Sequence, residues 1–161
     1  MIALKTFHRS PQLAELKVSY KRRKSADSRQ LRMPWIVTSS QTAEEYLRAV
    51  WDASKLELVE DFYVVCLNTV HEALGWVRVS SGGFDRTIVD CRLIFGIALQ
   101  AASAAVIVAH NHPSGHVQPS DHDRAVTAQL RAAGKVLHIP VLDHIILGKN
   151  AAFSFADAGL L

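Results

Sequence analysis

Residues 104–116 read Ala-Ala-Val-Ile-Val-Ala-His-Asn-His-Pro-Ser-Gly-His, and this stretch decides the fold and the chemistry that we expect. The apolar run over 104–109 predicts a buried β-strand. Side chains two residues apart on a strand point to the same face, so we expect His110 and His112 to converge on one point. The Pro-Ser-Gly that follows is typical of a turn, where the chain leaves the strand.

A helix is expected next. Ser120 has the position of an N-cap and Asp123 that of the acid in a capping box, before the helical run at 124–133. Asp123 would then lie in the first turn, facing back toward the end of the strand. Two imidazoles and one carboxylate, with a fourth position left for water, are typical of a catalytic zinc site. We therefore predict that His110, His112 and Asp123 bind zinc.

Each part of this pattern also has an ordinary structural explanation. A histidine at a strand end is usually a half-exposed polar residue, and Ser-x-x-Asp before an apolar run is usually only a helix cap. The parts together favour a metal site. His116 and His122 are alternative ligands, but His116 falls in the middle of a loop and His122 follows the cap on an outward face. We expect both to be solvated.

Three segments together resemble a known family: HNHPSGHVQPSDHD at 110–123, Leu-Asn-Thr at 67–69 and the segment at 142–148, Leu-Asp-His-Ile-Ile-Leu-Gly. They are similar to the RadC-type branch of the JAB/MPN (JAMM) metalloproteases. The resemblance covers about 40–161, which we take as the catalytic domain, preceded by an N-terminal arm at 1–39. It implies an α/β (α+β) sandwich of helices around a mixed sheet, of the JAB/MPN and cytidine-deaminase-like kind.

The resemblance also implies roles for single residues. His110, His112 and Asp123 would bind the zinc, Ser120 would hydrogen-bond within the site, and a glutamate well upstream would be the general base. It implies too a loose association with DNA repair, which no residue of this chain shows by itself.

Several carboxylates could be the upstream glutamate. The candidates are Glu57, Glu60 and Glu72, with Asp61 as an alternative carboxylate. Residues 60–62, Glu-Asp-Phe, resemble a Glu-x-Phe pattern of RadC-like sequences at the start of the apolar strand at 62–67. This resemblance favours Glu60. Glu72 falls in an apparent turn between two strands, where a charged residue normally faces solvent.

The predicted reaction is hydrolysis of an amide or isopeptide bond by a zinc-activated water. Glu60 would accept the proton of that water and pass it to the leaving amine, and Ser120 would help to share the charge of the tetrahedral intermediate. A ligating imidazole normally donates its other N–H to a carboxylate or carbonyl, and Asp143 is the candidate partner. His144 beside it is the rival candidate, or else a satisfied core residue.

Composition limits the setting of this site. A chain of 161 residues that is 49% hydrophobic suits one domain with a sizeable core. No apolar run approaches 18 residues and the N-terminus has no apolar signal core, so neither a membrane span nor export is expected. Cys66 and Cys91 do not make a disulfide framework, and the cytoplasm is the expected compartment.

The net charge of +3 is unevenly placed, with a basic cluster at Lys17–Lys24 and an acid-rich stretch at 44–61. Such an arm can make weak, salt-dependent contacts with DNA phosphates, although a short basic run is more often a solvated edge. The alternation at 13–20 is strand-like and allows the arm to extend a sheet edge, its own or that of a neighbour in a homodimer. The best linker is at 25–32.

The remaining elements follow from hydrophobic periodicity and caps. We expect helices at about 42–55, 91–103 and 121–134, begun by a Thr42–Glu45 capping box, by an Asp90 cap and by Ser120, the last ended by Gly134. We expect strands near 62–68, 73–81 and 139–147, and a short hairpin at 153–155.

Two functional classes stay open on the sequence. The first is a zinc-dependent peptidase-like hydrolase acting on an unknown peptide or protein. The second is a non-catalytic scaffold, associated with DNA or binding a protein. An HNH nuclease, suggested by the letters at 110–112, is excluded because that motif is spread over a hairpin and a helix.

Overall fold

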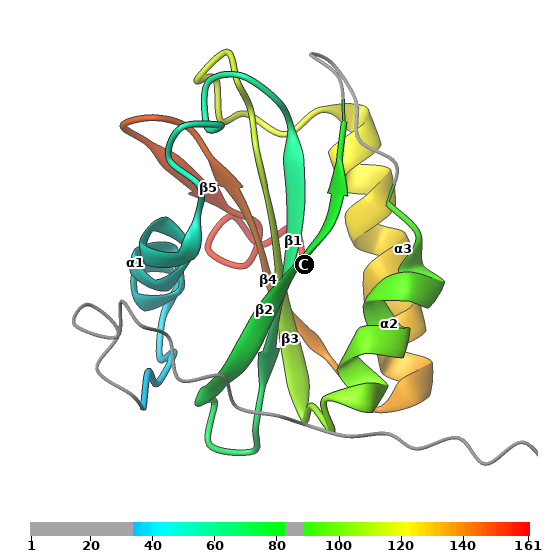
Figure 1. Ribbon diagram of the computed structural model, residues 1–161. Coiled ribbons are helices and arrows are strands. Elements are labelled where there is room, and N and C mark those ends of the chain that lie inside the picture. Colours follow the sequence, from blue (N-terminus) through cyan, green and yellow to red (C-terminus); the bar gives the residue numbers. More distant parts are fainter. Residues whose placement is uncertain (1–33, 83–88) are drawn as a thin grey trace, which may run out of the picture.

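A computed structural model describes residues 34–82 and 89–161. These residues form three layers, in which α1 covers one face of a β-sheet and α2 and α3 cover the other (Figure 1). The fold class expected from the sequence is confirmed. The basic cluster at 17–24, the strand-like alternation at 13–20 and the expected linker at 25–32 lie outside the described residues, so the DNA contact stays a prediction.

The sheet is mixed. Its strands lie in the order β2-β1-β3-β4-β5, in which only β3 and β4 are parallel neighbours. The elements are α1 (Ser40–Val50), β1 (Asp61–Leu67), β2 (Ala73–Ser81), α2 (Cys91–Gln100), β3 (Ala105–Asn111), α3 (Asp121–Leu137), β4 (Val141–Leu147) and β5 (Ala152–Ser154).

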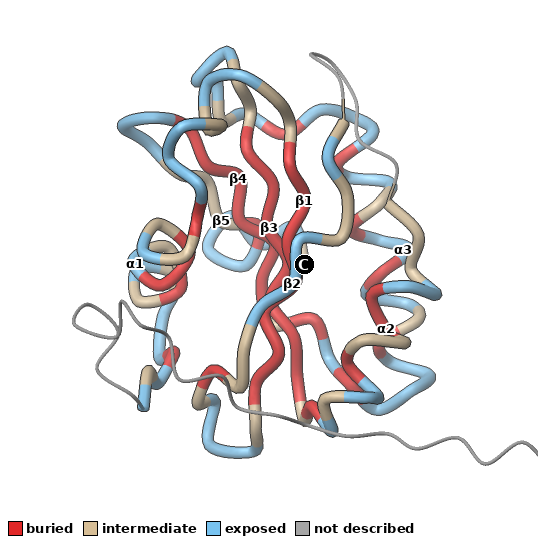
Figure 2. Tube along the Cα trace, viewed as in Figure 1, coloured by how far each residue is buried: buried red, intermediate tan, exposed pale blue. Residues whose placement is uncertain are grey.

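The central strands are buried on both faces, which explains their continuous apolar sequences. Every residue of β1 and β3 is buried, and Figure 2 shows these strands at the centre of the molecule. Even-numbered β3 residues such as Val106 and Val108 pack against the side of α2 and α3. Odd-numbered ones such as Ile107 and Ala109 pack on the side of α1. His110 continues the even-numbered face, and its side chain therefore lies on the side of α3.

Helix α1 begins at Ser40, two residues before the predicted capping box. Ser39 is its N-cap, accepting from the backbone N–H of Thr42, and the Thr42 hydroxyl bonds back to Ser39. The helix ends at Val50, because Trp51 is in an extended conformation. The predicted range of 42–55 was wrong at both ends. At the start of the helix, Thr42 is the N3 residue of the capping box and not the N-cap.

Helix α3 continues past Gly134, where we expected it to end. Its C-cap is His138, which is in the left-handed conformation with φ 55°. Gly134 is needed for packing instead, because a Cβ there would lie 2.5 Å from the Ile139 carbonyl oxygen and 3.2 Å from Phe95 Cζ. The glycine thus lets α3 approach α2 and the chain that returns to β4. For α2, the predicted Asp90 cap is confirmed, while the helix ends at Gln100 rather than 103.

The folded unit includes residues that we gave to the arm. The backbone N–H of Val37 donates to the His71 carbonyl, that of Ala73 donates to the Trp35 carbonyl, and Val37 is buried in the core beside α1. In the described part of the chain, no helix has the length and apolarity needed to cross a membrane.

Candidate metal centre

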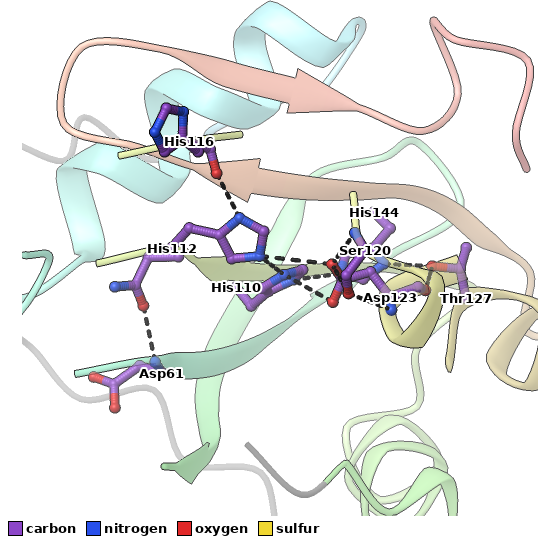
Figure 3. A network of polar contacts seen from close by, with 9 residues as sticks. Asp61, His110, His112, His116, Ser120, Asp123, Thr127 and His144 are labelled. Carbon is purple, nitrogen blue, oxygen red and sulfur yellow. Dashed lines mark hydrogen bonds and ion pairs between the residues drawn. The ribbon is translucent and has the colours of Figure 1, made fainter. Parts of the chain in front are cut away.

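Three potential ligand atoms meet where β3 ends and α3 begins. The Nε2 atoms of His110 and His112 lie 3.0 Å apart. The Asp123 carboxylate lies beside both, with Oδ1 3.2 Å from His110 Nε2 and Oδ2 3.6 Å from His112 Nε2. Figure 3 shows the two rings and the carboxylate turned toward one another. The structure thus brings together the three residues that the sequence predicts as ligands.

These atoms fit the dimensions of a zinc site. Nitrogen and oxygen ligands lie about 2.0–2.2 Å from a tetrahedral zinc ion, which places two such ligand atoms about 3.3–3.6 Å from each other. The separations of 3.0, 3.2 and 3.6 Å are close to this spacing. Two imidazoles and a single carboxylate are also a ligand set that suits zinc better than magnesium.

Local structure holds Asp123 in place. The backbone N–H and the hydroxyl of Ser120 both donate to Asp123 Oδ2 at 2.7 Å, and Ser120 Oγ accepts from the Asp123 N–H. This is the predicted capping box. The only hydrogen of the Ser120 hydroxyl is thereby directed to Asp123, so in this arrangement the serine holds a ligand rather than donating to a substrate.

The charges at the centre favour a cation. Burial alone would raise the pKa of the Asp123 carboxyl, but hydrogen bonds with the two histidines and Ser120 outweigh it and hold that pKa well below its usual range. The bond to Asp123 raises the pKa of the His112 imidazole, against the opposing effect of burial. Asp123 therefore stays ionised at neutral pH.

Both imidazoles also have partners for their second ring nitrogen. His112 Nδ1 donates to the backbone carbonyl of His116 at 2.6 Å. His110 Nδ1 lies 2.8 Å from His144 Nε2, and His144 Nδ1 lies 2.6 Å from the Thr127 hydroxyl. The sequence did not reveal His116 and Thr127 in these positions. One sequence feature could have indicated Thr127, because it lies four residues after Asp123 and therefore on the same face of the helix.

Asp143 does not orient a ligating imidazole, so that prediction was wrong. Its carboxylate accepts from the Ser154 hydroxyl and from the backbone N–H groups of His144 and Ala156. The register between β3 and β4 shifts by one residue just before Asp143, which places it opposite Ile107. Asp143 therefore faces α1, and the neighbouring His144 faces the site.

Glu60 and the metal centre share one cleft. Glu60 is half-buried directly before β1, and its charge contributes to the raised pKa of His112. The cleft is lined by Glu60, Phe62, Val89, His110, His122, Asp123, Val126 and His144. His122 is exposed, as expected, but it borders this cleft as well. The geometry thus permits Glu60 to act on a molecule bound beside the two histidines.

The other carboxylates considered upstream lie elsewhere. Glu57 is exposed and pairs with Lys149 at 2.9 Å. Glu72 accepts from Asn68 at the turn between β1 and β2, at the opposite end of β1. Asp61 is buried on the α1 side of the sheet, 3.5 Å from an Arg78 nitrogen. Of the four candidates, Glu60 alone lines the cleft.

Asn111, between the two histidines, holds the segment that carries Glu60. Its side-chain amide donates to the carbonyls of Leu56 and Val59 at 2.7 and 2.9 Å. Its Oδ1 accepts from the backbone N–H of Asp61 at 2.8 Å. Asn111 is fully buried, and its odd position on β3 turns it away from the histidines. No sequence motif indicated a role for this residue.

Comparison with known proteins gives a consistent match. The family model of the RadC-like JAB domain matches residues 37–160. A UPF0758 protein of Flavobacterium johnsoniae is 38% identical over 101 residues, 63% of this chain and 44% of the relative. A UPF0758 protein of Trichlorobacter lovleyi is 44% identical over 102 residues, with the same two shares. One of Chlorobaculum parvum is 37% identical over 126 residues, 78% of this chain and 55% of the relative. The chain spans about half the length of these relatives.

Proposed function

This chain belongs to the RadC-like JAB domain family, and from this premise we propose that it is a zinc-dependent hydrolase that cleaves an amide bond in a peptide or isopeptide substrate. One observation supports the proposal most strongly. Two imidazole nitrogens and a carboxylate lie within 4.8 Å of one another, in a cleft that Glu60 also lines. Both groups needed for metal-assisted hydrolysis, a ligand set and a separate proton acceptor, are therefore present.

His110, His112 and Asp123 would hold the ion. Zinc bound in this way lowers the pKa of a coordinated water to near neutrality and polarises a carbonyl group. Three protein ligands leave a position open, which distinguishes a catalytic zinc site from a structural one. His112 is partly exposed, while His110 and Asp123 are buried.

Glu60 would move the proton. In the proposed hydrolysis, a water oxygen bonds to the carbonyl carbon of the substrate and the carbon–nitrogen bond breaks. The Glu60 carboxylate accepts one proton from the water and delivers it to the departing nitrogen, so that an acid and an amine are released. Glu60 lines the cleft and is only half-buried, so its carboxylate can exchange protons with solvent between turnovers.

The apolar wall of the cleft serves the same reaction. Phe62, Val89 and Val126 line the cleft together with the polar groups. Side chains of this kind exclude bulk water, and hydrogen bonds and charges act more strongly in such surroundings. They also offer contact surface for an apolar part of a substrate.

The experiment compares wild-type protein with Glu60→Gln on libraries of peptides and isopeptide-linked conjugates. Loss of the proton acceptor should lower turnover by about 10²–10⁴-fold, since that is the usual contribution of a general base. Zinc content should not change, because Glu60 is not a ligand in this proposal. Equal activity of wild type and Glu60→Gln would show that the activity does not come from this cleft.

Glu57→Gln is the matched control. It makes the same chemical change three residues away, in an exposed side chain that pairs with Lys149 outside the cleft. It should retain wild-type turnover. A protein that binds zinc but cleaves no member of either library would instead favour the scaffold role.

A further inference from the structure

A circuit of hydrogen bonds runs from the backbone carbonyl of Asp123 through Thr127 and His144 to Nδ1 of His110. It begins at the Thr127 hydroxyl, which donates to the backbone carbonyl of Asp123 at 2.6 Å, one helical turn earlier. A hydroxyl has one hydrogen, and a carbonyl oxygen can only accept. Thr127 Oγ1 must therefore accept from its second partner, His144 Nδ1, at 2.6 Å. His144 thus carries a hydrogen on Nδ1.

The second nitrogen of His144 is then an acceptor. The His144 ring is fully buried, stacked on Phe155 with 4.8 Å between ring centroids and 5.6 Å from the ring of Phe62. A charged imidazolium in such apolar surroundings would be costly, so the ring is neutral and Nε2 has a lone pair. His110 Nδ1, at 2.8 Å from that lone pair, is therefore the donor.

The circuit ends at the metal centre. Because the Nδ1 hydrogen of His110 is donated to His144, Nε2 is the ring nitrogen left to bind a metal ion. That atom lies 3.0 Å from His112 Nε2 and 3.2 Å from Asp123 Oδ1. Figure 3 shows the three side chains side by side. In His112, too, Nε2 is the nitrogen left to bind a metal ion, because its Nδ1 donates to the backbone carbonyl of His116.

We propose that Thr127 and His144 are positioning residues, which fix His110 in the tautomer whose Nε2 can bind a metal ion. The inference rests on the proposed function, since it concerns the same centre. It goes further by giving a role to two buried polar residues on α3 and β4. The Thr127 hydroxyl sets the direction of every hydrogen bond in the circuit, although it touches neither ligand ring.

Removal of the Thr127 hydroxyl should reverse the donor and acceptor roles of His144 and His110 in the circuit. In Thr127→Val, which keeps the shape of the side chain, His144 Nδ1 has no acceptor. The His144 hydrogen is then more stable on Nε2, where it can be donated to His110 Nδ1. The His110 hydrogen is consequently on Nε2, the atom that would bind the metal. Thr127→Ser is the matched control, because serine keeps the hydroxyl and removes only a methyl group.

The first test is nitrogen–proton correlation NMR of the histidine rings in the metal-free full chain. We expect wild type and Thr127→Ser to carry the His144 hydrogen on Nδ1, and Thr127→Val to carry it on Nε2. A wild-type His144 with its hydrogen on Nε2 would overturn the proposal. So would a tautomer that is the same in wild type and Thr127→Val.

The second test measures zinc affinity by competition with a chelator, beside urea unfolding of the metal-free proteins. We expect Thr127→Val to bind zinc about 10–100-fold more weakly than wild type, the usual effect of losing a partner of a ligating histidine. Thr127→Ser should bind like wild type. Thr127→Val with lower stability but unchanged affinity would mean a purely structural role and would overturn the proposal. A wild type that binds no zinc would contradict the proposed function, while the His144 tautomer would still decide whether the circuit exists.

Discussion

Ser120 and Asp123 form a closed pair at the start of α3. The Ser120 hydroxyl and backbone N–H both donate to Asp123 Oδ2 at 2.7 Å, and the hydroxyl oxygen accepts from the backbone N–H of Asp123 at 3.2 Å. One residue thus caps the helix and orients the carboxylate that faces the two histidines. The cap of α3 and the position of a proposed metal ligand thus depend on the same serine.

Ser120→Ala should therefore lower both the stability of the protein and its affinity for zinc. The loss of an N-cap lowers the free energy of unfolding by about 0.5–2 kcal/mol. Zinc affinity should fall as well, because Asp123 loses the hydroxyl that orients its carboxylate. Urea unfolding of the metal-free protein and a zinc titration check the two effects, with Ser120→Thr as the variant that keeps both. Unchanged zinc affinity in Ser120→Ala would show that the cap does not position the ligand.

Gly134→Ala should destabilise the protein although alanine favours helices. The new Cβ would lie 2.5 Å from the Ile139 carbonyl oxygen, so the backbone of α3 or of the following turn must shift. Overpacking of this kind costs about 1–3 kcal/mol. Thermal or urea unfolding measures the change.

Gly96→Ala is the control for this prediction. Gly96 is also helical, but a Cβ built there meets no atom within 4 Å other than its chain neighbours and the backbone of its own helix. The substitution should stabilise the protein by up to about 1 kcal/mol, the difference in helix propensity between glycine and alanine. Equal effects at the two glycines would contradict the packing role of Gly134.

Asn111→Ala should lower activity without removing the metal. The substitution leaves the Leu56 and Val59 carbonyls without their donor, and the segment before β1 loses its attachment to β3. We expect a cost of about 1–3 kcal/mol in the free energy of unfolding, the range for a buried polar group left unsatisfied. Glu60, at the end of this segment, should become less well placed and turnover should fall.

The decisive comparison for Asn111 is between zinc content and turnover. Retained zinc with reduced turnover would support a role in placing Glu60. Loss of both in proportion would instead mean that Asn111 supports the end of β3. Asn111→Asp should also be destabilised, because a carboxylate oxygen would then face two carbonyl oxygens.

The site could be predicted from the sequence where it depends on local geometry. The alternation of side chains on a strand was enough to predict that His110 and His112 meet. The capping box was enough to place Asp123 in the first turn of α3. Both rules act over a few residues, and both hold in the structure.

Features that depend on other strands could not be predicted in this way. The register shift between β3 and β4 decides that His144, rather than Asp143, faces His110. Residue types do not reveal such a shift. The partner of His112 is a backbone carbonyl, that of His116, which any residue could supply. Gly134 appeared to be a helix end because its contact with Ile139 forms only when the chain turns back toward β4.

The account depends most directly on zinc bound by the His110, His112 and Asp123 side chains. Metal analysis of the purified full chain, after dialysis against a weak chelator, should find about one zinc ion per chain. His110→Ala and His112→Ala should retain the fold, checked by circular dichroism, and lose the zinc, while Glu60→Gln should keep it. A well-folded wild type without zinc, or a His110→Ala protein that still binds one ion, would contradict the account.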